Sequence, residues 1–117
     1  MTSTSTPRRP KPILIIEILG YVGVAFWLSM IVRSVLDDAA SAWPVILVGV
    51  VLGTAHIIIS VGSSRRSRMV YAAMWFVLIG DSVLTVFVDL KAVALVLFTV
   101  VLLVLTRAPS ARAWLAP

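Results

Sequence analysis

Three ionisable residues lie inside apolar stretches of this 117-residue chain, and they are the residues that could do chemistry. Glu17 lies early in the first apolar run, His56 lies late in the second, and Asp81 stands within "FVLIGDSVLTVF" in the third. Carboxylates and imidazole rings exchange protons and hold cations. Asp81 is the strongest candidate, because an ionisable group deep in an apolar run is by default a functional-site hypothesis.

Each of the three residues also has a structural interpretation. A neutral, hydrogen-bonded carboxyl at Asp81 would join helices, since an unpaired polar group is costly in apolar surroundings. Its possible partners are Ser82, Thr85 and Thr99. A single histidine such as His56 is more often a hydrogen-bonded packing residue than a ligand. Glu17 lies close to a basic segment, where its possible partners are Arg8, Arg9 and Lys11.

Other chemistries find no support in the sequence. With no cysteine and one histidine, the chain lacks the residues of a typical metal site or thiol enzyme. Ser60, His56 and Asp81 are the residue types of a hydrolase triad. However, Ser60 would lie about 3 Å and Asp81 about 18 Å above the same membrane face, too far apart for one imidazole to bridge. The sequence therefore predicts no catalytic residue, no metal and no cofactor.

The elements that must position these residues follow from the composition. Hydrophobic residues make up 61% of the chain and charged residues 13%, against roughly 45–50% and about 25% in an ordinary globular domain. A chain this short cannot bury all of this apolar surface in its own core. The apolar surface that remains must face lipid. The apolar runs cover about 13–32, 45–61, 69–88 and 90–105. Because four strands cannot close a membrane barrel, we predict an all-α, polytopic membrane protein with four transmembrane helices.

Outside these helices the sequence predicts no further folded domain. Residues 1–12 are rich in Ser, Thr, Pro and basic side chains, which indicates a disordered basic tail. Residues 13–106 form the predicted transmembrane domain, and 107–117 form a second, short tail. A cleaved signal peptide is disfavoured, because the first apolar run exceeds the usual length of about 7–15 residues and contains Glu17.

The distribution of basic side chains predicts the orientation. Most of the lysines and arginines lie in the two tails and in the 62–68 connection: Arg8, Arg9, Lys11, Arg65, Arg66, Arg68, Arg107 and Arg112. The other two connections carry one basic residue each together with aspartates. The positive-inside rule then places both termini in the cytoplasm, for a protein of the cell membrane. Because the basic residues flank apolar runs and form no single stripe, nucleic acid is not an expected partner.

A stripe of small and polar residues on the second helix predicts close packing. Gly49, Gly53, His56 and Ser60 recur at intervals of three and four residues, which places them on one helix face. Gly20 belongs to a similar but shorter stripe on the first helix. Small residues one turn apart let another backbone approach closely. We therefore expect these positions to hold the bundle or an oligomer together.

Depth along the helices predicts one specific pair. With a rise of about 1.5 Å per residue, Glu17 would lie about 7 Å, His56 about 9 Å and Asp81 about 18 Å above the cytoplasmic ends of their helices. The first two levels agree, and the two helices are consecutive. Antiparallel packing would then bring the Glu17 carboxylate to the His56 imidazole. No basic residue is expected at the level of Asp81.

Two resemblances to known families rest on particular residues. Four short helices in a chain of this length, with Glu17 early in the first, resemble the small multidrug resistance transporters. In that family such a glutamate exchanges protons for cationic drugs, at a site that two subunits form. The family's aromatic-and-glycine signature is absent from the second and third helices here.

The close of the chain carries the other resemblance. Its residues Pro109, Ser110, Arg112 and Trp114 follow the last apolar run. This ending is similar to that of many uncharacterised small four-helix integral membrane proteins of high-GC Gram-positive (actinobacterial) bacteria. The likeness implies no activity.

The sequence favours a non-enzymatic integral membrane protein, an accessory or self-associating subunit of a membrane assembly. Its partners would be the lipid bilayer and other membrane subunits or copies of itself. The alternative is a small proton-coupled transporter or ion conductor in which Glu17, His56 and Asp81 carry protons or a cation. A third possibility is a membrane-disrupting or immunity protein of phage type, which only the small size favours.

The predicted orientation can be measured directly. Reporter fusions after Arg68 and after Trp114 are expected to read cytoplasmic, and a fusion within 37–42 is expected to read external. A 62–68 connection that protease cleaves from the outer face would contradict this orientation.

Overall fold

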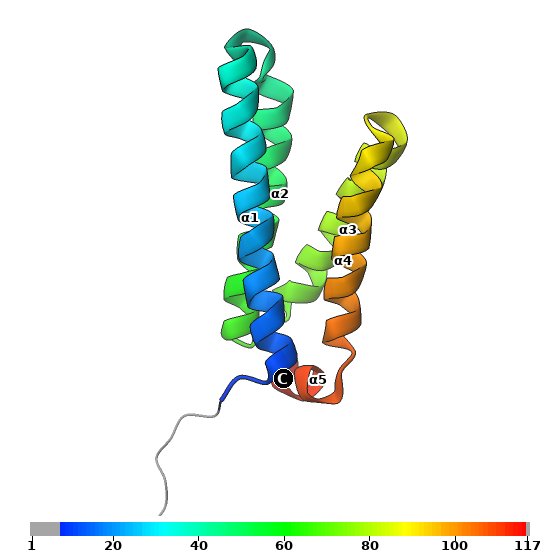
Figure 1. Cartoon of the computed structure of the whole chain (residues 1–117). Helices are drawn as coiled ribbons and strands as arrows, with labels where there is room; N and C mark the ends of the chain where they lie inside the picture. Colours follow the sequence, from blue (N-terminus) through cyan, green and yellow to red (C-terminus); the bar gives the residue numbers. More distant parts are fainter. Residues whose placement is uncertain (1–7, 117) are drawn as a thin grey trace, which may run out of the picture.

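The computed structural model describes residues 8–116, and within that range all regular structure is helical (Figure 1). The long helices are α1 (Lys11–Asp37), α2 (Trp43–Ser64), α3 (Met69–Phe87) and α4 (Val93–Thr106). The shorter ones are η1 (Ala39–Ser41), η2 (Leu90–Ala92) and α5 (Pro109–Leu115). The prediction of an all-α fold is confirmed.

Three helices, α1, α2 and α3, are long and apolar enough to cross a membrane. The fourth predicted run, 90–105, coincides with η2 and α4, and a bend of 81° separates these from α5. Ala108 has an extended ψ of 137° before Pro109, as expected because proline disfavours helical geometry in the residue before it. Residues 8–116 therefore contain three helices that can span a membrane, or four if the bent pair is one span.

Two predicted boundaries are corrected by the structure. The first helix begins at Lys11, so the predicted tail of residues 1–12 is too long at its inner end, and its residues 1–7 lie outside the described range. Pro12 fits the first turn, where its missing N–H would have no helical partner anyway. At the other end, the predicted tail 107–117 contains α5, which packs against the bundle.

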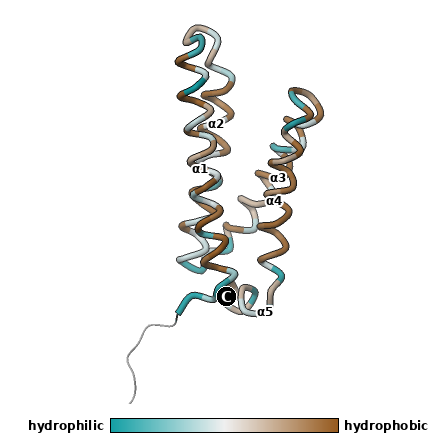
Figure 2. The backbone as a smooth tube through the Cα atoms, in the orientation of Figure 1, coloured by the Kyte–Doolittle hydropathy of each residue, from teal (hydrophilic) through white to brown (hydrophobic). Residues whose placement is uncertain are grey.

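The helices form two antiparallel hairpins, α1 with α2 and α3 with α4 (Figure 1). The hairpins meet where α5 and the α2–α3 connection lie, and they separate toward η1 and η2 (Figure 1). We call the first the basic end, because the start of α1, residues 65–68 and α5 bring most of the lysines and arginines there. The end with η1 and η2 is called the distal end. Hydrophilic residues gather at the two ends and hydrophobic ones cover the helices between them (Figure 2).

The glycine stripe on α2 packs against α1 within the same chain. A methyl group added at Gly49 would lie 2.7 Å from Cδ1 of Ile31, and one added at Gly53 would lie 3.8 Å from Cβ of Trp27. The large side chains of α1 thus occupy the space that the glycines of α2 leave. The prediction that this stripe is a packing surface is confirmed for the contact inside the bundle.

Nearer the basic end the roles of the two helices are exchanged. Here α1 supplies the glycines, and α2 supplies His56 and Ser60. A methyl group at Gly20 would overlap the Ser60 hydroxyl and lie 3.1 Å from the backbone oxygen of His56. At Gly23 it would lie 2.7 Å from Cγ of the His56 ring. The two backbones approach closely because no Cβ stands between them.

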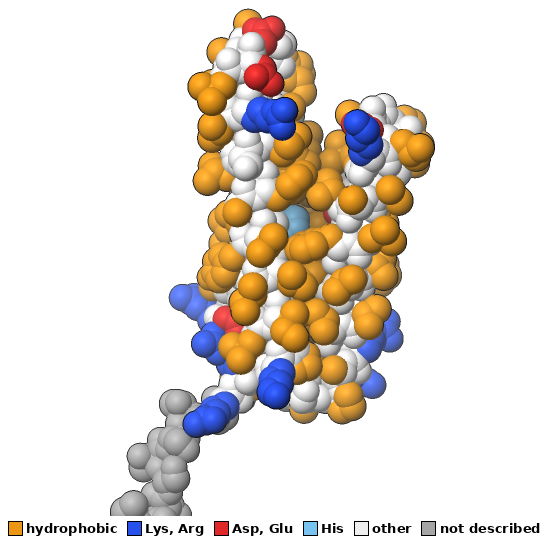
Figure 3. Space-filling model, in the orientation of Figure 1, with side chains coloured by type: hydrophobic (Ala, Val, Ile, Leu, Met, Phe, Trp, Pro, Cys, Tyr) orange, Lys and Arg blue, Asp and Glu red, His pale blue; other side chains and the backbone are white. Residues whose placement is uncertain are grey.

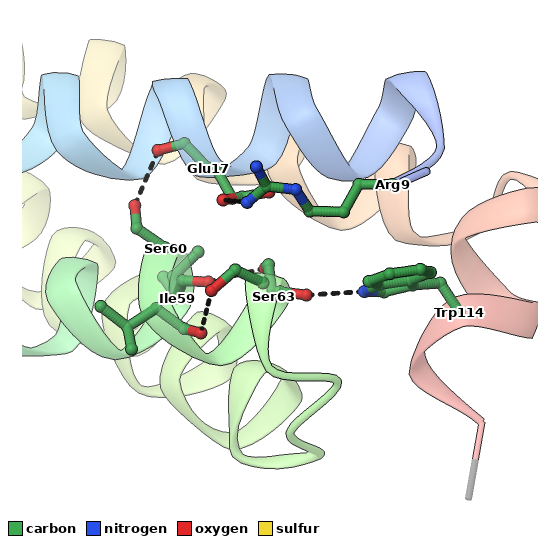
Figure 4. Close-up of polar contacts among 8 residues, drawn as sticks. Arg9, Glu17, Ile59, Ser60, Ser63 and Trp114 are labelled. Carbon is green, nitrogen blue, oxygen red and sulfur yellow. Dashed lines mark hydrogen bonds and ion pairs between the residues drawn. The ribbon is translucent and has the colours of Figure 1, made fainter. Parts of the chain in front are cut away.

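The short helix α5 closes the basic end. Its Ala111 and Leu115 are buried in the same core as the start of α1. Trp114 donates a hydrogen bond from Nε1 to the backbone oxygen of Ser63 at 2.8 Å (Figure 4). The guanidinium of Arg66 lies 4.0 Å from the centre of the Trp114 ring, a distance suited to a cation–π contact. These contacts fix α5 against the α2–α3 connection.

Alanine substitutions at two glycines test the packing of α1 on α2. Gly23→Ala should lower the stability of the bundle by about 1–3 kcal/mol, because the new methyl group overlaps the His56 ring. Gly53→Ala is the matched control: its methyl group meets only Trp27 at an ordinary contact distance, and alanine favours the helix by up to about 1 kcal/mol. Unfolding in mixed detergent, followed by circular dichroism, measures both. Equal losses would show that the close approach at Gly23 has no special role.

Candidate functional site

Asp81 lies on α3 and faces the inside of the bundle, with 2% of its surface exposed. Thr99 of α4 donates a hydrogen bond to its Oδ2 at 2.9 Å. Within residues 8–116 the other carboxyl oxygen, Oδ1, is buried and has no hydrogen-bond partner. The predictions that Asp81 faces protein and that Thr99 is among its possible partners are confirmed.

The other two predicted partners of Asp81 bond to backbone instead. Ser82 donates to the backbone oxygen of Leu78, and Thr85 donates to the backbone oxygen of Asp81. Both bonds join residues four apart on α3, a common local arrangement for hydroxyl side chains in helices. Thr99 stands on the facing helix of the hairpin, and its one hydroxyl hydrogen is shared between Asp81 Oδ2 and the backbone oxygen of Leu95, at 2.9 and 3.0 Å. The carboxyl therefore links α3 to α4 through one oxygen only.

His56 is buried on α2, with 3% of its surface exposed. Its Nδ1 lies 2.7 Å from the backbone oxygen of Leu52. A carbonyl oxygen only accepts, so in the neutral ring Nδ1 carries the hydrogen and Nε2 carries the lone pair. In the part of the chain that the structure describes, Nε2 makes no hydrogen bond. The imidazole is thus held at one nitrogen and free to accept at the other.

His56 and Asp81 line one small cavity of about 160 Å³ between the two hairpins. Its other lining residues are Val22, Gly23, Phe26, Trp27, Ala94, Leu95 and Phe98. The ring of Phe98 lies 6.3 Å from the His56 ring, centroid to centroid. The single histidine of the chain can be seen between the hairpins, in pale blue (Figure 3). The two buried ionisable groups of α2 and α3 thus share an otherwise apolar chamber.

A larger groove of about 470 Å³ leads from this cavity toward the distal end. The two spaces share Phe26, Trp27, Ala94 and Leu95. The remaining groove residues are Met30, Pro44, Val45, Val48, Leu84, Val88, Asp89, Lys91 and Ala92. The surface is hollowed between the separated ends of the hairpins (Figure 3). The cavity with His56 and Asp81 is the inner part of an apolar groove.

Glu17 lies outside this cavity, and the predicted Glu17–His56 pair is wrong. Its Oε1 forms an ion pair with Nη1 of Arg9 at 2.6 Å, and the Ser60 hydroxyl donates to its backbone oxygen at 2.8 Å (Figure 4). His56 packs instead against Gly23, which is about 9 Å further along α1 than Glu17. The alternative interpretation, pairing with a basic residue of the N-terminal segment, is the one that the structure has.

The expected difference in level between His56 and Asp81 is also corrected. Since α2 continues to Ser64, His56 stands about 12 Å from the end of its helix, and not about 9 Å as predicted. The greater height of His56 along its helix brings its level closer to that of Asp81. The sequence signal that would have located it is Gly23, three residues after Gly20 in "GYVGVAFW", because this pair extends the small-residue stripe of α1 up to the ring.

The cavity has few side-chain groups that could bind a ligand or a metal ion. Within residues 8–116 no three His, Cys, Asp or Glu side chains lie together in a way that could hold a metal ion. The polar groups at hand are one carboxyl, one imidazole and the Thr99 hydroxyl. The chamber is therefore suited to a proton or to a single charged group.

Comparison of the chain with protein-family models, with curated protein sequences and with solved structures found no match.

Replacing Thr99 tests the link between Asp81 and α4. Thr99→Val keeps the shape of the side chain but removes the only partner of Asp81 Oδ2 in the described structure. We expect a loss of about 1–3 kcal/mol in stability, because both carboxyl oxygens are then buried without a partner. Thr85→Val is the control, since it removes only a bond within α3. Detergent unfolding compares the two, and similar losses would mean that the Asp81–Thr99 bond contributes little.

Proposed function

We propose that this protein is a small non-enzymatic membrane transporter that takes up a proton or a cation at Asp81 and His56. The observation that carries the proposal is Oδ1 of Asp81, a buried carboxyl oxygen without a partner in the described structure, on a residue that lines the same cavity as His56. Buried polar groups are nearly always hydrogen-bonded, so one that is not calls for an explanation. The missing hydrogen bond is explained if this oxygen is the acceptor that binds the proton or the cation.

A purely structural role for Asp81 explains less of the geometry. A carboxyl that only joined helices would be expected to use both oxygens in bonds to the protein. Here one oxygen bonds Thr99 and the other is buried without a partner in the described structure, on a residue that lines a cavity continuing into a groove. Glu17 also has one buried oxygen, Oε2, without a partner in the described structure, but Glu17 does not line the cavity of His56. The free Nε2 of His56 in the same cavity offers a second proton acceptor.

The difference between the two ends of the bundle indicates from which side of the membrane the site would be reached. The groove extends from the cavity toward the distal end, where it reaches Asp89 and Lys91. At the basic end, α5 packs its buried Ala111 and Leu115 against the bundle. With the basic end in the cytoplasm of the cell, as the positive-inside rule favours, the site would be open to the outer side and closed to the inner one.

The sequence favoured an accessory-subunit function, which now has less support than the transporter. Such a subunit was expected to use the stripes on the first three helices, and the stripe on α2 packs on α1 within the chain. Glu17 is paired with Arg9, so it is not part of the proposed site. Association with other subunits or with a second copy remains a prediction, and a crosslinking experiment in membranes would test it.

Proton uptake in liposomes tests the proposed function. Asp81→Asn keeps the shape of the neutral acid and its hydrogen bond to Thr99, but it cannot release a proton. We expect the variant to fold like the parent and to lose uptake driven by a pH gradient, with a pH-sensitive dye inside the vesicles as readout. Glu17→Gln is the matched control, because it removes a carboxylate outside the cavity. Unchanged uptake by Asp81→Asn would refute the proposal.

A further inference from the structure

We infer that the cavity and its groove bind an amphiphilic primary or secondary ammonium ion, whose head lies at Asp81 and His56. The inference rests on the proposed function and names the ligand class of the same site. It follows from three independent properties of the site: its hydrogen-bonding groups, its charge and the shape of its apolar walls.

The free polar atoms of the cavity are acceptors. Asp81 Oδ1 has no partner in the described structure, and when ionised a carboxylate only accepts. The hydrogen bond from Nδ1 of His56 to Leu52 leaves Nε2 as an acceptor as well. Two acceptors on residues that line one chamber fit a ligand group with at least two N–H donors. A primary or secondary ammonium has these, whereas a quaternary ammonium has none.

The charge of the site selects a cation. Within residues 8–116 the structure forms one ion pair, Arg9–Glu17, so Asp81 has no basic partner there. The cation among the groove residues, Lys91, lies at the far end of the groove next to Asp89. A ligand ammonium would neutralise the carboxylate, and a charge-assisted hydrogen bond is about twice as strong as a neutral one.

The apolar side chains that line the cavity and the groove favour a ligand with an apolar chain. Phe26 and Trp27 line both the cavity and the groove, and aromatic faces attract cations. The cavity of about 160 Å³ suits a small head group. The adjoining groove of about 470 Å³ is lined mainly by apolar side chains and lies within the usual range of ligand pockets, roughly 300–1,000 Å³. An inorganic cation fits less well, because calcium takes about 6–8 oxygen ligands and magnesium about six.

Equilibrium binding of three related probes tests the ligand class. The purified full-length protein in lipid nanodiscs is titrated by calorimetry with octylammonium, octyltrimethylammonium and octanol, each corrected for binding to empty nanodiscs. The probes share a chain and differ in charge and N–H donors. We expect octylammonium to bind at least about tenfold more tightly than the other two, as a charge-assisted hydrogen bond requires.

Variants then assign the binding to the cavity. Asp81→Asn should lower the affinity for octylammonium at least about tenfold, while Glu17→Gln should change it by less than about twofold because Glu17 lines neither the cavity nor the groove. If Asp81→Asn does not fold, the selectivity of the parent among the three probes decides the question. Equal affinities for all three probes would show nonspecific filling by lipid-like chains and overturn the inference. Equal affinities for the two cations would overturn the assignment of a donor-bearing head.

The outcomes also separate this inference from the proposed function. Selective octylammonium binding without pH-driven proton uptake would refute transport and leave a membrane-embedded binding protein. Proton uptake that depends on Asp81, without selective binding, would refute the ligand class and leave the transporter.

Discussion

The close approach of α1 and α2 at Gly20 and Gly23 is the constraint on which the rest of the structure depends. It lets the Ser60 hydroxyl reach the backbone of α1 and seats the His56 ring against Gly23. In lipid there is little hydrophobic force between helices, so contact at short range and interhelical hydrogen bonds must supply the association. The same glycines that hold this hairpin together therefore also place the imidazole at the cavity.

A second consequence of this packing is that the two ends of the molecule differ in how closely the hairpins pack. At the basic end the hairpins are joined by core contacts, by α5 and by the Trp114–Ser63 hydrogen bond. Toward the distal end they diverge, and the groove lies between them (Figure 1). Asp81 and His56 sit where the closed part meets the open part. Oδ1 of Asp81 is buried there without a hydrogen-bond partner in the described structure.

The fold class could be predicted from the sequence, because composition and run length leave little choice. A chain with 61% hydrophobic residues and so few charges must place its apolar surface in lipid, and backbone polar groups in lipid must bond within helices. The direction of Asp81 followed from the same physics, since a carboxyl facing lipid is costly. The packing role of Gly49 and Gly53 followed from their helical spacing. Each of these inferences concerns a single helix and its solvent, which the sequence describes directly.

What only the tertiary structure decided is which helix faces which, and at what height. The pairing of Glu17 with Arg9, the contact of His56 with Gly23 and the shared cavity of His56 and Asp81 all depend on helix ends and on the register between helices. An error of three residues at one helix end shifts a side chain by about 4.5 Å, more than the length of a hydrogen bond. Helical periodicity specifies a face but no register, so the sequence determined the three ionisable residues and the tertiary packing determined which two of them form a site.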